Sequence, residues 1–158
     1  MRMRIGQGID FHRLEKGLNL WLGGILIPSE KGCVAHSDGD VLLHAICDAM
    51  LGAAGLKDIG FYFPDNSPEF KGIDSKILLK KTFDKVKSAG YSVVNIDATV
   101  CLEKPKISSY IDEMKSVISP ILETNPDNIS IKATTTEKLG FAGREEGIAA
   151  TAVALISK

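Results

Sequence analysis

All three histidines of the chain lie within its first 44 residues, among aspartates. Asp10, His12 and His44 form a plausible ligand set for a divalent metal ion, because imidazole and carboxylate groups together suit Zn²⁺. Three protein ligands would leave a fourth coordination position open for a substrate, which favours a metal-dependent enzyme. The residues alone leave an alternative, in which His12 and His44 are ordinary, partly buried histidines bonded to nearby aspartates.

The third histidine, His36, precedes Ser37 and the expected N-terminus of a helix. Free backbone N–H groups at a helix N-terminus can meet a phosphate, so His36 is a candidate phosphate-binding residue. Its alternative is a loop histidine that caps local backbone. Gly6 and Gly8 do not indicate a dinucleotide site, because the third glycine of that motif would fall at Phe11.

Two further stretches carry groups that could bind a substrate. Residues 132–144 hold three threonines, two lysines, Glu137 and Arg144. Hydroxyl and N–H groups can hold phosphate oxygens, and Glu137 can hold a hard cation such as Mg²⁺. The alternative is a strand end followed by a solvated, charged turn. In residues 57–65, Asp58 could bond ribose hydroxyls; its alternative is a helix cap, with Phe61 and Phe63 packed in the core.

Hydrophobic periodicity places these residues on an ordered set of elements. The expected strands are 4–12, 18–22, 25–27, 91–102, 129–135 and 148–156, and the expected helices are 38–54, 74–89 and 107–122. In the first helix, Asp40, His44 and Asp48 are four residues apart and share one face. The order of elements predicts the α/β class, an α+β sandwich with one mixed sheet and helices on one face.

Composition limits the number of domains, the kind of partner and the cellular compartment that the chain can have. A chain of 158 residues suits one domain, and a net charge of −1 argues against a nucleic-acid partner. The three cysteines lack a Cys-x-x-Cys spacing and are expected to be free thiols in a reducing compartment. No apolar run is long enough for a membrane span, and residues 1–4 do not resemble the start of a signal peptide. We therefore expect a cytoplasmic protein that does not enter a membrane.

Taken together, these stretches closely resemble the 2-C-methyl-D-erythritol 2,4-cyclodiphosphate synthase family of the non-mevalonate isoprenoid pathway. The matching blocks span nearly the whole chain in the family's order. They are Gly8-Ile9-Asp10-Phe11-His12, Ala35-His36-Ser37-Asp38-Gly39-Asp40, Asp58-Ile59-Gly60, Phe63-Pro64-Asp65, Phe70-Lys71-Gly72-Ile73-Asp74-Ser75 and Lys132 through Gly140. The second and the last of these blocks are long enough to be highly specific.

The resemblance implies one catalytic domain over residues 1–158. Its reaction would cyclise 4-diphosphocytidyl-2-C-methyl-D-erythritol 2-phosphate by attack of the 2-phosphate on the β-phosphorus, releasing CMP. It further implies Zn²⁺ on Asp10, His12 and His44, and Mg²⁺ or Mn²⁺ on Glu137. The implied substrate contacts are His36, Ser37 and Asp65 at the erythritol phosphate end, Asp58 and Gly60 at the ribose, Lys104, Pro105, Lys106, Thr134 and Thr135 around the cytidine, and also Phe141 and Arg144.

The family also implies a homotrimer with active sites between subunits and sheets around the threefold axis. Residues 148–156 fit this arrangement, because they are apolar at almost every position and predict a strand covered on both faces. Two other functions stay open. One is a zinc-dependent phosphohydrolase, which would release free phosphate. The other is a trimeric binding module with a structural metal, which the open fourth ligand position disfavours.

Overall fold

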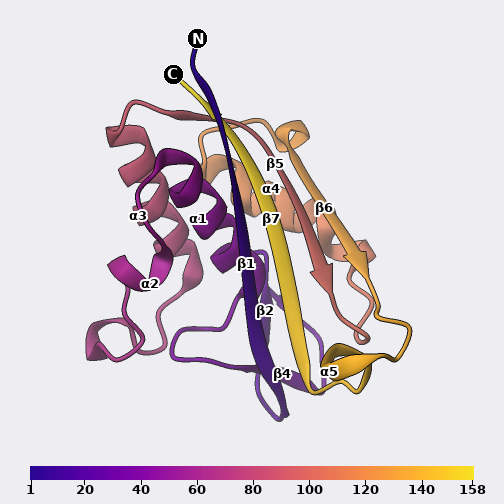
Figure 1. The fold of residues 1–158 in the computed structure, drawn as a ribbon. Helices are drawn as coiled ribbons and strands as arrows, with labels where there is room; N and C mark the ends of the chain where they lie inside the picture. Colours follow the sequence, from indigo (N-terminus) through magenta and orange to yellow (C-terminus); the bar gives the residue numbers. More distant parts are fainter.

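The structure, a computed structural model, describes residues 1–158 as a sheet with helices packed on one side (Figure 1). The strands are β1 (Met3–Lys16), β2 (Leu20–Leu22), β3 (Ile25–Ile27), β4 (Lys31–Val34), β5 (Ser92–Cys101), β6 (Ile129–Thr134) and β7 (Gly147–Ser157). The helices are α1 (Val41–Ala54), α2 (Ile59–Tyr62), α3 (Ser75–Ser88), α4 (Ile111–Ile121) and α5 (Gly140–Gly143), with short 3₁₀ turns at Pro68–Phe70, Ser108–Tyr110 and Pro126–Asn128. None of the helices combines the length and the apolar character needed to cross a membrane.

The main sheet has five strands in the order β4-β1-β7-β5-β6. β1 and β7 pair antiparallel along almost their whole length, whereas β5 and β6 are parallel, so the sheet is mixed as expected. α1 packs on β1 and β7, α4 packs on β6, and α3 lies against α1 and α4. The two chain ends leave the same end of the sheet together (Figure 1).

Helix α1 is the central element of the core, and nearly all of its side chains are buried. Its first turn is capped by the buried carboxylate of Asp40, which accepts hydrogen bonds from the N–H groups of Leu43, Gly23 and Gly24. Gly55 ends the helix in a left-handed conformation, with φ of 72°. Asp40 therefore fixes the helix start and the β2–β3 turn together. Its carboxylate bonds Gly23 and Gly24, whereas His44 faces Asp10, so Asp40 does not share the one face that was expected for it with His44 and Asp48.

Strand β1 turns glycines, rather than large apolar residues, toward α1. A Cβ at Gly6 would lie 2.1 Å from the carbonyl oxygen of Ala49, and one at Gly8 would lie 2.0 Å from that of Ala45. The backbones of β1 and α1 therefore touch. This contact brings the strand residues that follow Gly8 close to the helix.

The opposite face of the sheet carries exposed apolar side chains and no helix. On β1, Ile5, Ile9 and Phe11 are 46–71% exposed, and Val153 on β7 is 37% exposed. The inward residues of β7, such as Ala152 and Ala154, are buried instead. Within one chain the β7 strand is thus covered on a single face, and its outer face lies among other exposed apolar residues.

Several expected elements have different limits in the structure. The strands around Gly23 and Gly24 form a hairpin, but it is a separate two-stranded sheet and not part of the main one. The first two expected helices begin later, at Val41 and Ser75, because Asp40 and Asp74 are caps outside the helix. The elements β4, α2 and α5 were not expected; each has only four residues, which is too short for a periodic signal. All three cysteines are free, and Cys33 and Cys47 are buried.

Candidate active site

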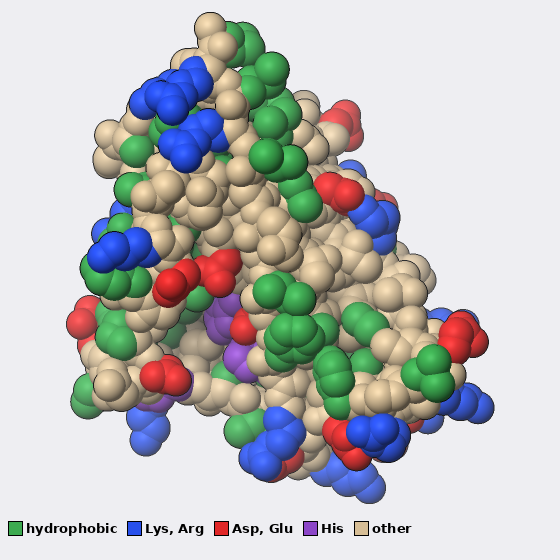
Figure 2. All heavy atoms as spheres, in the orientation of Figure 1, with side chains coloured by type: hydrophobic (Ala, Val, Ile, Leu, Met, Phe, Trp, Pro, Cys, Tyr) green, Lys and Arg blue, Asp and Glu red, His purple; other side chains and the backbone are tan.

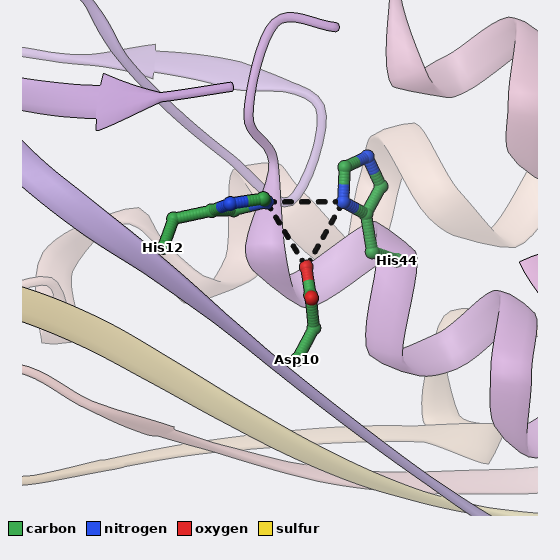
Figure 3. A group of neighbouring side chains, drawn as sticks. All are labelled: Asp10, His12 and His44. Atoms are coloured by element: carbon green, nitrogen blue, oxygen red, sulfur yellow. Dashed lines mark hydrogen bonds and ion pairs between the residues drawn. The ribbon is translucent and has the colours of Figure 1, made fainter. Parts of the chain in front are cut away.

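Asp10, His12 and His44 converge on one point at the end of the β1–α1 contact (Figure 3). His12 Nε2 lies 3.2 Å from His44 Nδ1, and Asp10 Oδ2 lies 3.0 Å from each of these nitrogens. Asp10 and His12 leave the same face of β1, while His44 comes from the first turn of α1. The structure therefore brings together the three residues that the sequence singled out.

The donor set and its spacing fit a tetrahedral metal ion. A Zn²⁺ ion with bonds of about 2.0–2.1 Å separates its ligand atoms by about 3.3 Å, close to the observed edges of the triangle. A carboxylate and two imidazoles are ligands that Zn²⁺ accepts, and no fourth protein donor joins the group. The arrangement can hold a metal ion with one coordination position free.

The charges of the three side chains are coupled. Burial alone would raise the pKa of Asp10, but hydrogen bonds and attraction from His12 and His44 outweigh it and hold the pKa well below its usual range. Burial would lower the pKa of His44, but the carboxylate of Asp10 outweighs it and raises the pKa. Asp10 therefore stays ionised, as a metal-ligating carboxylate must be.

The other ring nitrogen of His44 is held by hydroxyl groups. His44 Nε2 lies 2.9 Å from Ser75 Oγ and 3.3 Å from Ser37 Oγ. Ser75 is the first residue of α3, is fully buried, and also contacts the carboxylate of Asp38 through both its N–H and its hydroxyl. Ser75 was not singled out as a functional residue from the sequence, because nothing in its local pattern relates it to His44.

The triad lies on the wall of a cavity of about 530 Å³. Figure 2 shows the histidines at the bottom of a hollow with carboxylates and apolar groups at its edges. Besides the triad, the expected site residues on its wall are His36, Ser37, Gly60 and Asp65. The cavity combines a metal-binding group with room for a small polar substrate.

His36 is held by the loop that follows α2. Its Nε2 lies 2.8 Å from the carbonyl oxygen of Ser67, and its own carbonyl oxygen accepts a bond from Gly72 N–H. A carbonyl oxygen only accepts, so Nε2 carries a proton and donates it. The local-backbone role considered for His36 is thus present, and the other ring nitrogen is left for a ligand.

Asp58 caps the short helix α2. Its Oδ1 accepts a bond of 2.9 Å from Phe61 N–H, as the helix-cap alternative expected. The core packing that the same alternative expected for Phe61 is wrong, because this side chain is 57% exposed. Asp48, on the face of α1 next to His44, accepts a bond of 2.7 Å from Ile59 N–H and so fastens α2 beside the triad.

Glu137, Thr134 and Thr135 lie away from the triad within one chain. Thr134, Thr135, Pro105 and Lys106 line a separate cavity of about 230 Å³ between the ends of β5 and β6. Glu137 is exposed in the turn after β6, with φ of 53°. It does not belong to the group of possible metal ligands around Asp10.

A residue that the sequence did not indicate, Glu103, shapes this second region. Its Oε1 accepts bonds from the N–H groups of Thr136 and Lys138, at 3.0 and 3.2 Å. These bonds hold the turn that carries Glu137. Glu103 lies 33 or more residues before its partners, so no local motif relates them.

Lys104, Phe141 and Arg144 line neither of these two cavities. Lys104 pairs with Glu145 at 3.2 Å, and Arg144 forms two bonds of 3.0 Å with Glu146. Phe141 is stacked edge-on against Phe11, with ring centroids 5.9 Å apart. A direct substrate contact from any of these three residues remains a prediction.

Comparison with known proteins identifies close relatives over the full chain. The YgbB family model matches residues 3–157. A 2-C-methyl-D-erythritol 2,4-cyclodiphosphate synthase of Bacteroides fragilis is 57% identical over 158 residues, covering 100% of this chain and 99% of the relative. The synthase of Natranaerobius thermophilus is 55% identical, with 99% of each chain covered.

Solved structures of similar proteins share the fold. The bifunctional IspDF from Campylobacter jejuni is 43% identical, with a TM-score of 0.94, over 98% of this chain and 42% of that one. A 2C-methyl-D-erythritol-2,4-cyclodiphosphate synthase in a CDP-bound form is 37% identical, with a TM-score of 0.89, over 98% of this chain and 100% of that one.

Proposed function

Because the chain belongs to the YgbB family and its close relatives are 2-C-methyl-D-erythritol 2,4-cyclodiphosphate synthases, we propose that it carries out their cyclisation with Zn²⁺ at Asp10, His12 and His44. The substrate would be 4-diphosphocytidyl-2-C-methyl-D-erythritol 2-phosphate, and the products would be the 2,4-cyclodiphosphate and CMP. The observation that carries this proposal is the convergence of three ligand atoms on the wall of the larger cavity.

The reaction joins two anionic groups of one flexible molecule. When bound, Zn²⁺ at the triad and Mg²⁺ or Mn²⁺ at Glu137 would offset the repulsion between the attacking 2-phosphate and the anionic oxygens of the β-phosphate. The nucleophile is already an anion, so no side chain is needed as a general base. What the protein must supply is a fixed, folded pose for the substrate.

The larger cavity suits the erythritol end of this substrate. His36, Ser37 and Asp65 lie on its wall with the triad. We assign these groups to the 2-phosphate end, and Asp58 and Gly60 to the ribose. The bond from His36 to Ser67 supports the first assignment, because it orients the ring.

The smaller cavity suits the cytidine. Its wall carries the hydroxyls of Thr134 and Thr135 and the Pro105-Lys106 pair, which can contact a base and a phosphate. A relative of known structure binds CDP, which supports a cytidine nucleotide as ligand. Lys104, Phe141 and Arg144 complete the proposed substrate contacts around this end of the sheet.

A trimer would join the two cavities. They are separate within one chain, and the sheet face without helices is apolar at Ile5, Ile9, Phe11 and Val153. Packing these faces around a threefold axis would bury them and bring Glu137 of one subunit toward the triad of the next. We therefore propose a homotrimer with intersubunit sites, located in the cytoplasm and without a nucleic-acid or membrane partner.

Metal content and product identity test the proposal together. We expect about one Zn²⁺ per chain, and stoichiometric release of CMP and cyclic diphosphate from the cytidine substrate. His44→Ala should lose both zinc and turnover, because one of three ligands is removed. Free phosphate as product would instead establish the zinc-dependent phosphohydrolase. Full zinc content in the His44→Ala chain would disprove the ligand assignment.

A further inference from the structure

His44 could present either ring nitrogen to a metal ion, and the residues behind it decide which. A neutral imidazole carries its proton on one nitrogen, and only the other nitrogen has the lone pair that a metal needs. Nδ1 faces the triad, and Nε2 faces the hydroxyl of Ser75 at 2.9 Å. The direction of the hydrogen bond to Ser75 therefore sets the metal-binding ability of Nδ1.

The carboxylate of Asp38 settles the direction of that bond. An ionised carboxylate only accepts hydrogen bonds, so the Ser75 hydroxyl must donate its single proton to Asp38 Oδ1. Asp38 is itself held in place, because its oxygens also accept the N–H groups of Asp40 and Ser75. The Ser75 oxygen is then left with lone pairs toward His44, and it can only accept from Nε2–H.

The hydroxyl of Ser37, which also lies near His44 Nε2, does not change the expected position of the imidazole proton. Ser37 Oγ accepts the N–H of Gly39 and keeps its own proton, but it lies farther from His44 Nε2, at 3.3 Å, than Ser75 Oγ does. If Nε2 had no proton, its lone pair would face that of Ser75 Oγ at 2.9 Å, which is repulsive. The closer contact thus favours a protonated Nε2.

We propose that Asp38 and Ser75 form a positioning relay that holds the proton of His44 on Nε2 and leaves Nδ1 as the metal-binding atom. The inference rests on the proposed function, since it takes the triad to be a metal site. Neither Asp38 nor Ser75 touches the three ligand atoms. They act by fixing the tautomer and the ring orientation, as hydrogen-bond partners of metal-bound histidines do.

The tautomer can be measured directly in the wild-type chain. Long-range ¹H–¹⁵N spectra of the zinc-loaded protein should show His44 with a protonated Nε2 and a metal-bound Nδ1. The chain has only three histidines, so through-bond correlations from each ring to its own backbone can assign the His44 signals in the zinc-loaded wild type. Coordination of zinc by Nε2, or a proton on Nδ1, would overturn the inference whatever the variants show.

Variants test the relay itself. Ser75→Ala removes the acceptor and should weaken zinc binding by about 10- to 100-fold in a chelator competition. Asp38→Asn can donate to Ser75 and turn the hydroxyl toward His44, so it should raise the Nδ1-protonated tautomer and weaken zinc binding similarly. Thr82→Val is the control, because Thr82 is a buried hydroxyl on the same helix without a hydrogen-bond partner.

The relay and the zinc site are rejected by different results. Wild-type zinc affinity and an unchanged His44 spectrum in both Ser75→Ala and Asp38→Asn would reject the relay and leave the zinc site standing. Equal weakening by Thr82→Val would show a general packing effect and reject the relay as well. A wild-type chain that binds no zinc would reject the proposed function, and with it the relay.

Discussion

Two carboxylates near the larger cavity, Asp10 and Asp58, have different surroundings and should behave differently when altered. Asp10 is partly buried and converges with two imidazoles, whereas Asp58 is exposed and caps a four-residue helix. The first therefore belongs to a charged cluster, and the second combines a structural bond with a free oxygen. A single substitution at such a position changes more than one interaction. Each therefore needs a second variant that removes only one of them.

Glu137→Gln should keep zinc but lose most turnover, with kcat falling by about 100-fold or more. The amide is nearly the same size but lacks the charge that a hard cation requires. Turnover measured against Mg²⁺ concentration checks this, because the variant should need far more Mg²⁺ than the wild type. Glu123→Gln is a matched control, since Glu123 is also a glutamate at positive φ. Identical Mg²⁺ dependence in the Glu137 variant and the wild type would contradict the assignment.

Asp58→Ala should raise KM for the cytidine substrate by about 10- to 100-fold with little change in kcat. Ribose hydroxyls are remote from the reacting phosphorus, so their bonds act on ground state and transition state alike. Asp58→Asn retains a good N-cap for α2 and separates the two roles of the residue. Full recovery of KM in Asp58→Asn would assign the whole effect to the cap, against a charge-dependent ribose contact.

Among the elements, the contact between β1 and α1 does most to position the triad. It places Asp10 and His12 on the strand opposite His44 on the helix, and it depends on the absence of side chains at Gly6 and Gly8. The approach is backbone against backbone, so side-chain repacking does not relieve an added atom. The separation of the two halves of the site is therefore set by main-chain atoms.

Gly8→Ala should lower the free energy of unfolding by about 3 kcal/mol or more, because the new Cβ would overlap main-chain atoms of Ala45. Gly52→Ala, on the opposite end of the same helix–strand contact, is the control. Its nearest neighbour would be Gln7 O at 3.9 Å, so it should stabilise by about 0.5–1 kcal/mol. Urea unfolding of both chains measures the difference, and equal stabilities would disprove the close contact.

The sequence predicted the long elements because their periodicity extends over several turns or strand residues. It did not predict β4, α2 or α5, which are held by contacts with distant residues, such as the bond between Asp48 and Ile59. In β1, the pattern of Ile5, Ile9 and Phe11 did not reveal which face is inward, because the inward positions are glycines. Residue types singled out the triad but left its alternative of ordinary histidines open, and the family resemblance favoured the metal site; Ser75 and Glu103 required the folded chain.

At the scale of the whole molecule, the outer face of the sheet carries exposed apolar side chains that no helix of the chain covers. Val153 lies in its middle strand, between Gln7 on β1 and Asp97 on β5. Covering this face should contribute to stability through burial of the apolar surface. The state of association and the activity should therefore change together.

Val153→Asp should give monomers or insoluble protein, with activity lost in either case. In the proposed interface the new carboxylate would lie opposite Asp97 and would carry a large desolvation cost. Light scattering with an activity assay on the same sample measures both properties. Val153→Thr, which has nearly the same shape, should stay trimeric. An active monomer of the Val153→Asp chain would disprove the intersubunit site.

Two inactive variants should restore each other if each site takes His44 from one subunit and Glu137 from the next. In randomly mixed trimers of His44→Ala and Glu137→Gln chains, about a quarter of the sites contain both native residues. Co-refolding the two chains should thus recover about a quarter of wild-type turnover. Each variant refolded alone is the control, and no recovery in the mixture would place both residues in one subunit's site.

The backbone contact at Gly6 and Gly8 also bears on which metal the protein acquires. Because main-chain packing sets the spacing of Asp10, His12 and His44, we expect folding alone to form the site, without the ion that a zinc finger needs. Different divalent cations would then compete for a site whose geometry is already set. Nitrogen and oxygen ligands bind Cu²⁺ more tightly than Zn²⁺, so intrinsic affinity does not protect the enzyme from mismetallation. The supply of free metal during biosynthesis, rather than the folding of the chain, should decide whether it carries zinc.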